Sequence, residues 1–364
     1  MLKNKSLNIS WLEGASILTV SQIFSTVVYS AQSQNGLSAT ASMIAFLLGT
    51  LINFIVIVPF STLSVKCQKK SLIEHSYSCL GNFALIVALA VFAIFIAVST
   101  DTVVQFQKFL SNTVYPGSSG VVIIVLLVIS ASYGAFLGIE ALGRVANIIF
   151  SLVSLAILLI LLATVKDVNL QNFGTIQPSD IGNIFNVAIK GVISNTGILA
   201  AFMLLHNVKS NHFKGLCFWN FASLVIVEII VSTVTGVLGV YGSDKKYPYF
   251  TTATVAEFSV LKRLDILYLC IWIFVAFVKT TLYLLLSKRI LDTALSGAGK
   301  KHSLSFCSVL ILLLSYIASI KENFYAVVKL VLSSGWMFLI LVIILPIVLL
   351  LIPSKQKGAK NADT

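Results

Sequence analysis

Charged residues are scarce in this sequence. Only 10% of its 364 residues are Asp, Glu, Lys or Arg, whereas soluble domains carry about 25%. Hydrophobic residues make up 58% of the chain, and its mean hydropathy is +0.99. The apolar residues form runs of about twenty, longer than the stripes of an amphipathic soluble helix. A water-soluble enzyme is therefore excluded, and the sequence predicts an all-α polytopic membrane protein.

Sequence patterns typical of catalysis and cofactor binding are also missing. The five cysteines form no C-x-x-C pair, and the four histidines show no metal-ligand spacing beyond a weak His206/His212 pair. The nearest approach to a phosphate-binding loop is Gly299-Lys300, but Ala294 stands where that loop needs a glycine. We therefore predict no enzymatic activity, no cofactor and no metal site.

Ten apolar runs are long enough to cross a membrane, because about 20 helical residues cover a hydrocarbon core of about 30 Å. Pro346 predicts a kink in the last run, and residues 353–364 are expected to form a disordered tail. An even number of spans places both termini on one side. The whole chain, 1–364, is expected to form a single transmembrane domain surrounded by lipid. The runs are 11–32, 38–65, 81–110, 119–138, 145–165, 184–206, 216–241, 264–288, 303–320 and 332–352.

The positions of the basic residues predict the orientation of these spans. Cations are retained on the cytoplasmic face, and an N-terminus inside the cell puts fifteen Lys and Arg in inner segments and eight in outer ones. Both termini and the tail are therefore expected in the cytoplasm. The net charge of +12 then reflects topology, and a nucleic-acid partner has little support.

The ten spans divide into two halves around the polar stretch 166–183. We expect five-helix repeats at 10–165 and 183–352, because many secondary transporters are inverted repeats whose first helices are broken beside the ligand. Spans one and six are the polar ones here. The polar residues are Ser21, Gln22, Ser25, Thr26, Ser30 and Gln32 in span one, and Gly191, Ser194, Asn195, Thr196 and Gly197 in span six.

Two interpretations of these polar runs remain open. In the first, both helices unwind and offer backbone groups to a ligand's carboxylate and ammonium, aided by the partial positive charge of a half-helix N-terminus. In the second, the Ser, Thr and Asn side chains bond back to their own helix or to a neighbour. Their matching positions in the two halves favour the first.

Six stretches of the sequence carry a family resemblance: Gly138–Arg144, Tyr247–Phe250, Glu257–Phe258, Leu261–Tyr268, Cys270–Phe274 and Phe277–Leu284. On these residues the sequence resembles the endospore germination permease family, the membrane B subunits of nutrient germinant receptors, within the amino acid/polyamine/organocation superfamily. The resemblance implies a leucine-transporter-like fold with a site formed by spans one, three, six and eight. It also implies a larger membrane A subunit and a lipoprotein C subunit as partners, in the spore inner membrane.

The expected binding strip departs from this family. The family tends to have glycine at the span-one break and proline after it, where this chain has Phe24 or Ser25 and then Ala31. It often has an F-P-F-G-E-like run in span six, where this chain has Ser194–Ile198. The identity of the ligand therefore does not transfer from the family.

Charges within spans need partners or water, because one at the bilayer centre costs about 2.5–3.5 kcal/mol on insertion scales. Lys279 in span eight is expected to replace a coupling sodium ion by bonding span-one carbonyls; pairing for stability or snorkelling is the alternative. Asp101 in span three is its expected counter-charge or a water-facing carboxylate. Glu228 in span seven is a proton-relay candidate or a structural group. Phe24, Ile198 and Tyr283 are expected to form apolar pocket walls.

The function predicted from these features is that of a ligand-sensing subunit. It would bind a small nutrient, expected to be an amino acid, near the midplane and trigger spore germination through partner subunits. A proton-coupled secondary transporter for amino acids or polyamines is one alternative. A scaffold subunit with a degenerate site is the other.

Overall fold

The computed structural model describes residues 9–28, 37–66, 71–208, 212–256, 264–294 and 299–352, and these ranges are helical apart from short connections. The expected tail 353–364 lies outside them. The α-helices are α1 (Trp11–Val28), α2 (Ala39–Lys66), α3 (Leu72–Leu80), α4 (Ala84–Phe109), α5 (Gly120–Leu137), α6 (Ile139–Thr164), α7 (Asp180–Ile193), α8 (Thr196–Leu205), α9 (His212–Leu238), α10 (Pro248–Val255), α11 (Asp265–Ala294), α12 (Gly299–Ile320), α13 (Glu322–Ser333), α14 (Gly335–Leu339) and α15 (Leu345–Leu351).

Within the described ranges, eight helical stretches are long and apolar enough to span a membrane, and Ile340–Leu351 is a shorter apolar helix. The prediction of an all-α polytopic membrane protein is confirmed. The count of ten spans and the repeat boundaries at 10–165 and 183–352 stay predictions.

Two span boundaries differ from those expected. The third span begins earlier, with α3, because Ser71 and Glu74 form a capping box in which each side chain bonds the other's backbone N–H. The last span was expected to begin at residue 332, but helix α13 already begins at Glu322, and α14 follows it after Ser334. A π-helical turn at Ile340–Ile344 precedes Pro346. This turn accommodates Pro346, which has no backbone N–H to donate to the helix.

The predicted interruption of span one at Phe24 or Ser25 is wrong, because α1 is continuous from Trp11 to Val28. The hydroxyls of Thr19 and Thr26 donate to the carbonyls of Ala15 and Gln22, one turn earlier in the same helix. This is the own-helix alternative for the polar run, and such bonding leaves the helical backbone intact.

The predicted interruption of span six is confirmed. Helix α7 ends at Ile193, and α8 begins at Thr196. The amide oxygen of Asn195 accepts from the backbone N–H of Gly197 at 3.0 Å and caps α8. The polar run at Ser194–Gly197 therefore makes a true break, whereas Ser21, Gln22, Ser25 and Thr26 lie within continuous helix. Ser30 and Gln32 of the span-one run lie outside the described residues.

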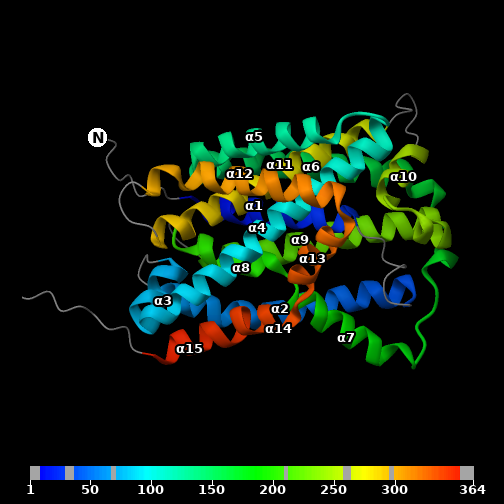
Figure 1. Ribbon diagram of the computed structural model, residues 1–364. Helices are drawn as coiled ribbons and strands as arrows, with labels where there is room; N and C mark the ends of the chain where they lie inside the picture. The colour runs from blue at the N-terminus through cyan, green and yellow to red at the C-terminus, as the bar shows by residue number, and fades with distance from the viewer. Residues whose placement is uncertain are drawn as a thin grey trace, which may run out of the picture.

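Helix α1 lies at the centre of the bundle and packs against α6, α9 and α11. Helix α4 packs on α11, and α2 packs on α7 and α9. Figure 1 shows α10 at one end of the bundle and α3 and α15 at the other. The buried core is mainly apolar, but it also contains 24 buried polar residues among those that the structure describes, including Lys279.

Side chains and backbone tie several helices together at the α3 and α15 end. The backbone N–H of Ile9 donates to the Asn207 carbonyl at 2.9 Å, and the Arg289 guanidinium donates to the Asn207 side chain. Lys288 and Asp292 form an ion pair at 2.6 Å. Burial and the nearby Arg289 charge lower the pKa of His206 to about 4, so its imidazole is neutral at pH 7. These contacts hold α1, α8 and α11 together at this end.

Close packing of α2 on α7 depends on Gly49. A Cβ atom at this position would lie 3.2 Å from the backbone oxygen of Ala188, so a branched side chain must push the helices apart. We expect Gly49→Val to lower the free energy of unfolding by about 1–3 kcal/mol through overpacking, measured as a fall in the melting temperature of the purified protein in detergent.

The matched control is Gly182→Val in α7, where a Cβ atom meets nothing within 4 Å. It places the same β-branched side chain in a helix without the clash. Equal losses of melting temperature in the two variants would contradict the packing explanation.

Candidate ligand cavity

A cavity of about 690 Å³ lies inside the bundle, lined by residues of α1, α2, α4, α7, α8, α9, α11 and α13. It includes Asn53 and Asn220, within α2 and α9, and reaches Ser42 in the first turn of α2, at the end of that helix away from α3. The structure brings the following predicted site residues to its wall: Ser25, Thr26, Asp101, Ser194, Asn195, Thr196, Glu228 and Lys279. Helix α2 also lines it, although no residue of this helix was predicted for the site.

Four other predicted site residues lie behind this wall. Phe24, Gly197, Ile198 and Tyr283 are buried and support the residues that line the cavity. The Tyr283 hydroxyl and the Thr196 hydroxyl are 2.9 Å apart and share a hydrogen bond. At Gly197, a Cβ atom would lie 3.0 Å from the Trp219 ring. The first turn of α8 is thus fixed between α11 and α9.

The Lys279 ammonium lies at the wall between α11 and α1. Its Nζ donates to the Ser25 hydroxyl at 2.7 Å and lies 5.1 Å from the centre of the Phe24 ring. The residue is 6% exposed. The predicted bonding to span-one carbonyls is corrected to a hydroxyl, because α1 does not unwind there and its carbonyls remain in the helix.

Asp101 accepts hydrogen bonds from two side chains. The Gln105 amide donates at 2.5 Å, and the Tyr325 hydroxyl of α13 donates at 2.9 Å. The ammonium groups of Lys108 and Lys329 lie 4.3 and 4.9 Å from the centre of the Tyr325 ring. The carboxylate is therefore already held by its own surroundings, and among the described residues it forms no direct ion pair with Lys279.

An aromatic cluster joins α1, α4 and α11 to the residue before α10. The rings of Phe24 and Trp272 are 4.7 Å apart, those of Phe109 and Trp272 are 4.9 Å apart, and those of Phe109 and Tyr247 are 4.8 Å apart. Tyr268 stacks on Trp272. Burial raises the pKa of Tyr247 to about 12. The start of α10 is therefore packed onto α4 and α11; Glu257–Arg263 lie outside the described residues.

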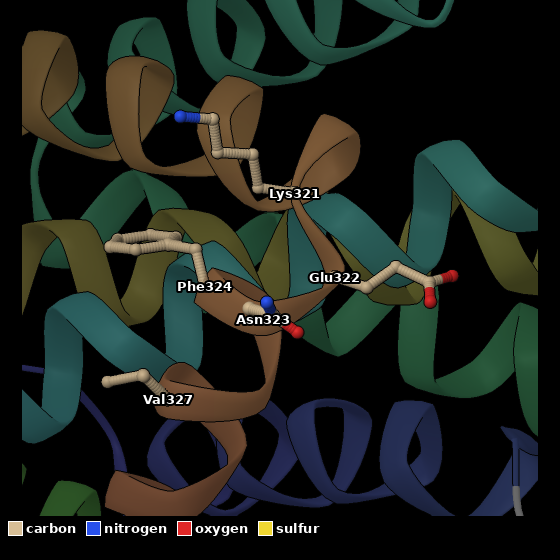
Figure 2. A pocket seen from close by; sticks show the side chains of 5 residues that line it. All are labelled: Lys321, Glu322, Asn323, Phe324 and Val327. Carbon is tan, nitrogen blue, oxygen red and sulfur yellow. The ribbon is translucent and has the colours of Figure 1, made fainter.

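A second hollow lies at the first turns of α13, away from this cavity. Figure 2 shows its five lining residues, with the side chains of Lys321, Phe324 and Val327 pointing to one side and Glu322 to the other. Four of the five are exposed and Phe324 is half-buried. This surface has none of the buried polar groups that line the larger cavity.

Sequence reasoning missed several cavity groups. Trp219, Asn53 and Asn220 line the wall, and Tyr325 bonds Asp101. The one available signal was a pair of amides within apolar runs, at Asn53 and Asn220. Nothing in the sequence indicates that Asn53 donates a hydrogen bond to Asn220, 167 positions away.

The fold is that of the leucine-transporter-like proteins. A crystal structure of MhsT in complex with L-phenylalanine is similar over 94% of this chain and 98% of that one, with a TM-score of 0.62 and 14% identity. A Na⁺-coupled sialic acid symporter matches over 92% of this chain and 78% of its own, with a TM-score of 0.66 and 14% identity. A manganese transporter of Eremococcus coleocola matches over 94% and 78%, with a TM-score of 0.60 and 12% identity.

The sequence matches a family model over residues 8–327, and the description of that model is spore germination protein. The chain therefore belongs to the spore permease family of spore germination proteins, which confirms the family resemblance. None of the curated proteins compared with it matches in sequence.

The two residues at the α7–α8 break differ in what they support. Asn195 caps α8, and Asn195→Ala should cost about 1 kcal/mol of stability. Ser194 is exposed, and its hydroxyl donates to the Lys190 and Gly191 carbonyls of the preceding helix, so Ser194→Ala should cost less than about 0.5 kcal/mol. Melting temperatures of the two variants measure this difference, and the reverse order would show that Asn195 does not hold the start of α8.

Proposed function

We propose that the cavity binds a small amino-acid-like nutrient and that the chain is the sensing subunit of a spore germinant receptor. One observation carries the proposal. The Lys279 ammonium is buried beside a cavity and, among the described residues, has a hydroxyl but no carboxylate as its hydrogen-bond partner. A buried cation in a membrane protein is expensive unless paired, and a ligand carboxylate would supply the missing charge.

Two further groups suit a carboxylate at this end of the cavity. The indole N–H of Trp219 lines the wall, is buried and has no hydrogen-bond partner among the described residues. The first turn of α8 carries the partial positive charge of a helix N-terminus, and Trp219 packs close to Gly197 in that turn. Lys279, Trp219 and α8 together form a donor-rich corner.

The position of the cavity along the bundle fits sensing from the outer side. The cavity reaches Ser42 in the first turn of α2, at the end of that helix away from α3, and the Ile9, Asn207 and Arg289 contacts tie the helices at the α3 end. The distribution of basic residues predicts that both termini, and thus the α3 end, face the cytoplasm. In this proposal the chain lies in the spore inner membrane, and binding shifts a two-state helix rearrangement that reaches the larger A subunit and the lipoprotein C subunit. The ligand drives that shift only by binding one state more tightly.

The test of the site is Lys279→Met. The change removes the ammonium but keeps a long unbranched side chain, so we expect an assembled protein that no longer shows an increase in melting temperature with any amino acid that stabilises the wild type. The matched control is Lys190→Met, because Lys190 is exposed on α7 and does not line the cavity. Full retention of the ligand-induced shift in Lys279→Met would exclude Lys279 from the site.

The test of sensing against transport is uptake in liposomes by the purified chain alone. We expect ligand binding without concentrative uptake, because the ligand acts here as a signal. Concentrative uptake driven by a proton gradient would establish the rival function of a secondary transporter. Absence of both binding and uptake across a nutrient panel would instead establish a scaffold with a degenerate site.

A further inference from the structure

Acceptor groups gather on the side of the cavity formed by α9 and α2. Asn220, Ser223 and Glu228 of α9 and Asn53 of α2 all line it, and we refer to these four residues as the α9 wall. Glu228 lies two helical turns beyond Asn220, about 12 Å along the helix axis. The Glu228 end of this wall is separate from the Lys279 corner, because Trp219, the α9 residue of that corner, lies nine residues before Glu228, about 13 Å along the helix axis.

Among the described residues, the Glu228 side chain has no hydrogen-bond partner. Both carboxylate oxygens are buried, and neither bonds to any described residue. This contrasts with Asp101, whose two oxygens accept from Gln105 and Tyr325. A buried carboxylate without donors is strongly disfavoured unless a cation or a proton joins it.

The amides of the wall present a further acceptor. The Nδ2 of Asn220 donates to the Thr50 carbonyl at 3.0 Å. Because a carbonyl can only accept, this bond fixes the Asn220 amide with its Oδ1 toward Asn53. Asn53 in turn donates from Nδ2 to that oxygen at 2.7 Å. This chain of bonds fixes the orientation of both amides. Among the described residues, the buried Oδ1 of Asn53 is therefore left without a donor. The buried Ser223 hydroxyl also has no hydrogen-bond partner there.

The cations that line the cavity do not supply these missing donors. Lys279 is bonded to Ser25 at the α1–α11 wall. Lys329 is exposed on α13, with its ammonium over the Tyr325 ring beside Asp101. Among the titratable groups of the described cavity lining, Glu228 is thus the one that lacks both a hydrogen-bond partner and a counter-charge beside it.

We propose that the α9 wall is a second subsite that receives a cationic group on the ligand side chain. This inference rests on the proposed function, because the ligand's carboxylate occupies the Lys279 corner. A ligand whose only ammonium is next to its carboxylate keeps both charges at one end. The two separated corners instead suit a basic amino acid, whose side chain carries a second ammonium across the cavity to Glu228.

The experiment compares L-lysine with L-norleucine, which has a similar unbranched chain without the terminal ammonium. Binding to the purified full-length protein is measured by calorimetry in sodium-free buffer. We expect the wild type to bind L-lysine at least tenfold more tightly than L-norleucine. Glu228→Gln keeps the shape of the side chain and removes its charge, so it should abolish this preference. Binding of L-norleucine by the variant shows that the variant is folded.

The matched control is Glu140→Gln, because Glu140 lies at the start of α6, pairs with Arg144 and does not line the cavity. It should keep the wild-type preference. Equal binding of both ligands to the wild type would overturn the second subsite while leaving the proposed function standing. No binding of any amino acid would defeat the proposed function and this inference with it.

A third arm separates a ligand ammonium from an inorganic ion. The melting temperatures of the wild type and Glu228→Gln are measured in sodium chloride and in choline chloride without amino acid. We expect no sodium-specific difference between the two proteins. Stabilisation of the wild type by sodium that is lost in Glu228→Gln, without a preference for L-lysine, would assign Glu228 to an ion and overturn the proposal.

Discussion

A buried ammonium bonded to a hydroxyl is the interaction on which the arrangement of the cavity depends. Lys279 reaches from α11 to Ser25 of α1 at 2.7 Å and lies over the Phe24 ring. Burying a lysine within a span costs about 2.5–3.5 kcal/mol on insertion scales, and one neutral hydroxyl offsets only part of that. The remainder makes the Lys279 corner receptive to an anion. Trp219 and the start of α8 face the same cavity, so the corner offers donors from three helices.

The architecture was largely predictable because the bilayer imposes it. Runs of about twenty apolar residues must become helices, since hydrocarbon offers no partner for an open backbone group. The break at Ser194–Asn195 was predictable as well, because Asn195 is a strong N-cap and a glycine follows Thr196. The polar run of α1 has a similar composition and yet stays helical. Its threonine hydroxyls bond carbonyls one turn back, and composition does not tell this outcome from unwinding.

The candidate site was only partly predictable, and the reason is distance along the chain. Charges within apolar runs stand out, so Asp101, Glu228 and Lys279 were found from the sequence. Their partners were not: Tyr325 bonds Asp101 across 224 positions, and Ser25 bonds Lys279 across 254. Asp101 is held by Tyr325 and Gln105 and forms no direct ion pair with Lys279, but its negative charge still favours the Lys279 ammonium, so its role as counter-charge stays a prediction. Glu228 then remains as the acidic group without donors, on a wall that the family resemblance did not include.

The central claim is that a nutrient carboxylate binds between Lys279 and the first turn of α8. An electron cryo-microscopy structure of the chain with a saturating amino acid, chosen because it raises the melting temperature, tests this most directly. The account predicts ligand density in the cavity, with its carboxylate within hydrogen-bond distance of the Lys279 ammonium and the Trp219 indole. An empty cavity, or density bound elsewhere on the protein while Lys279 remains bonded to Ser25 alone, would contradict it.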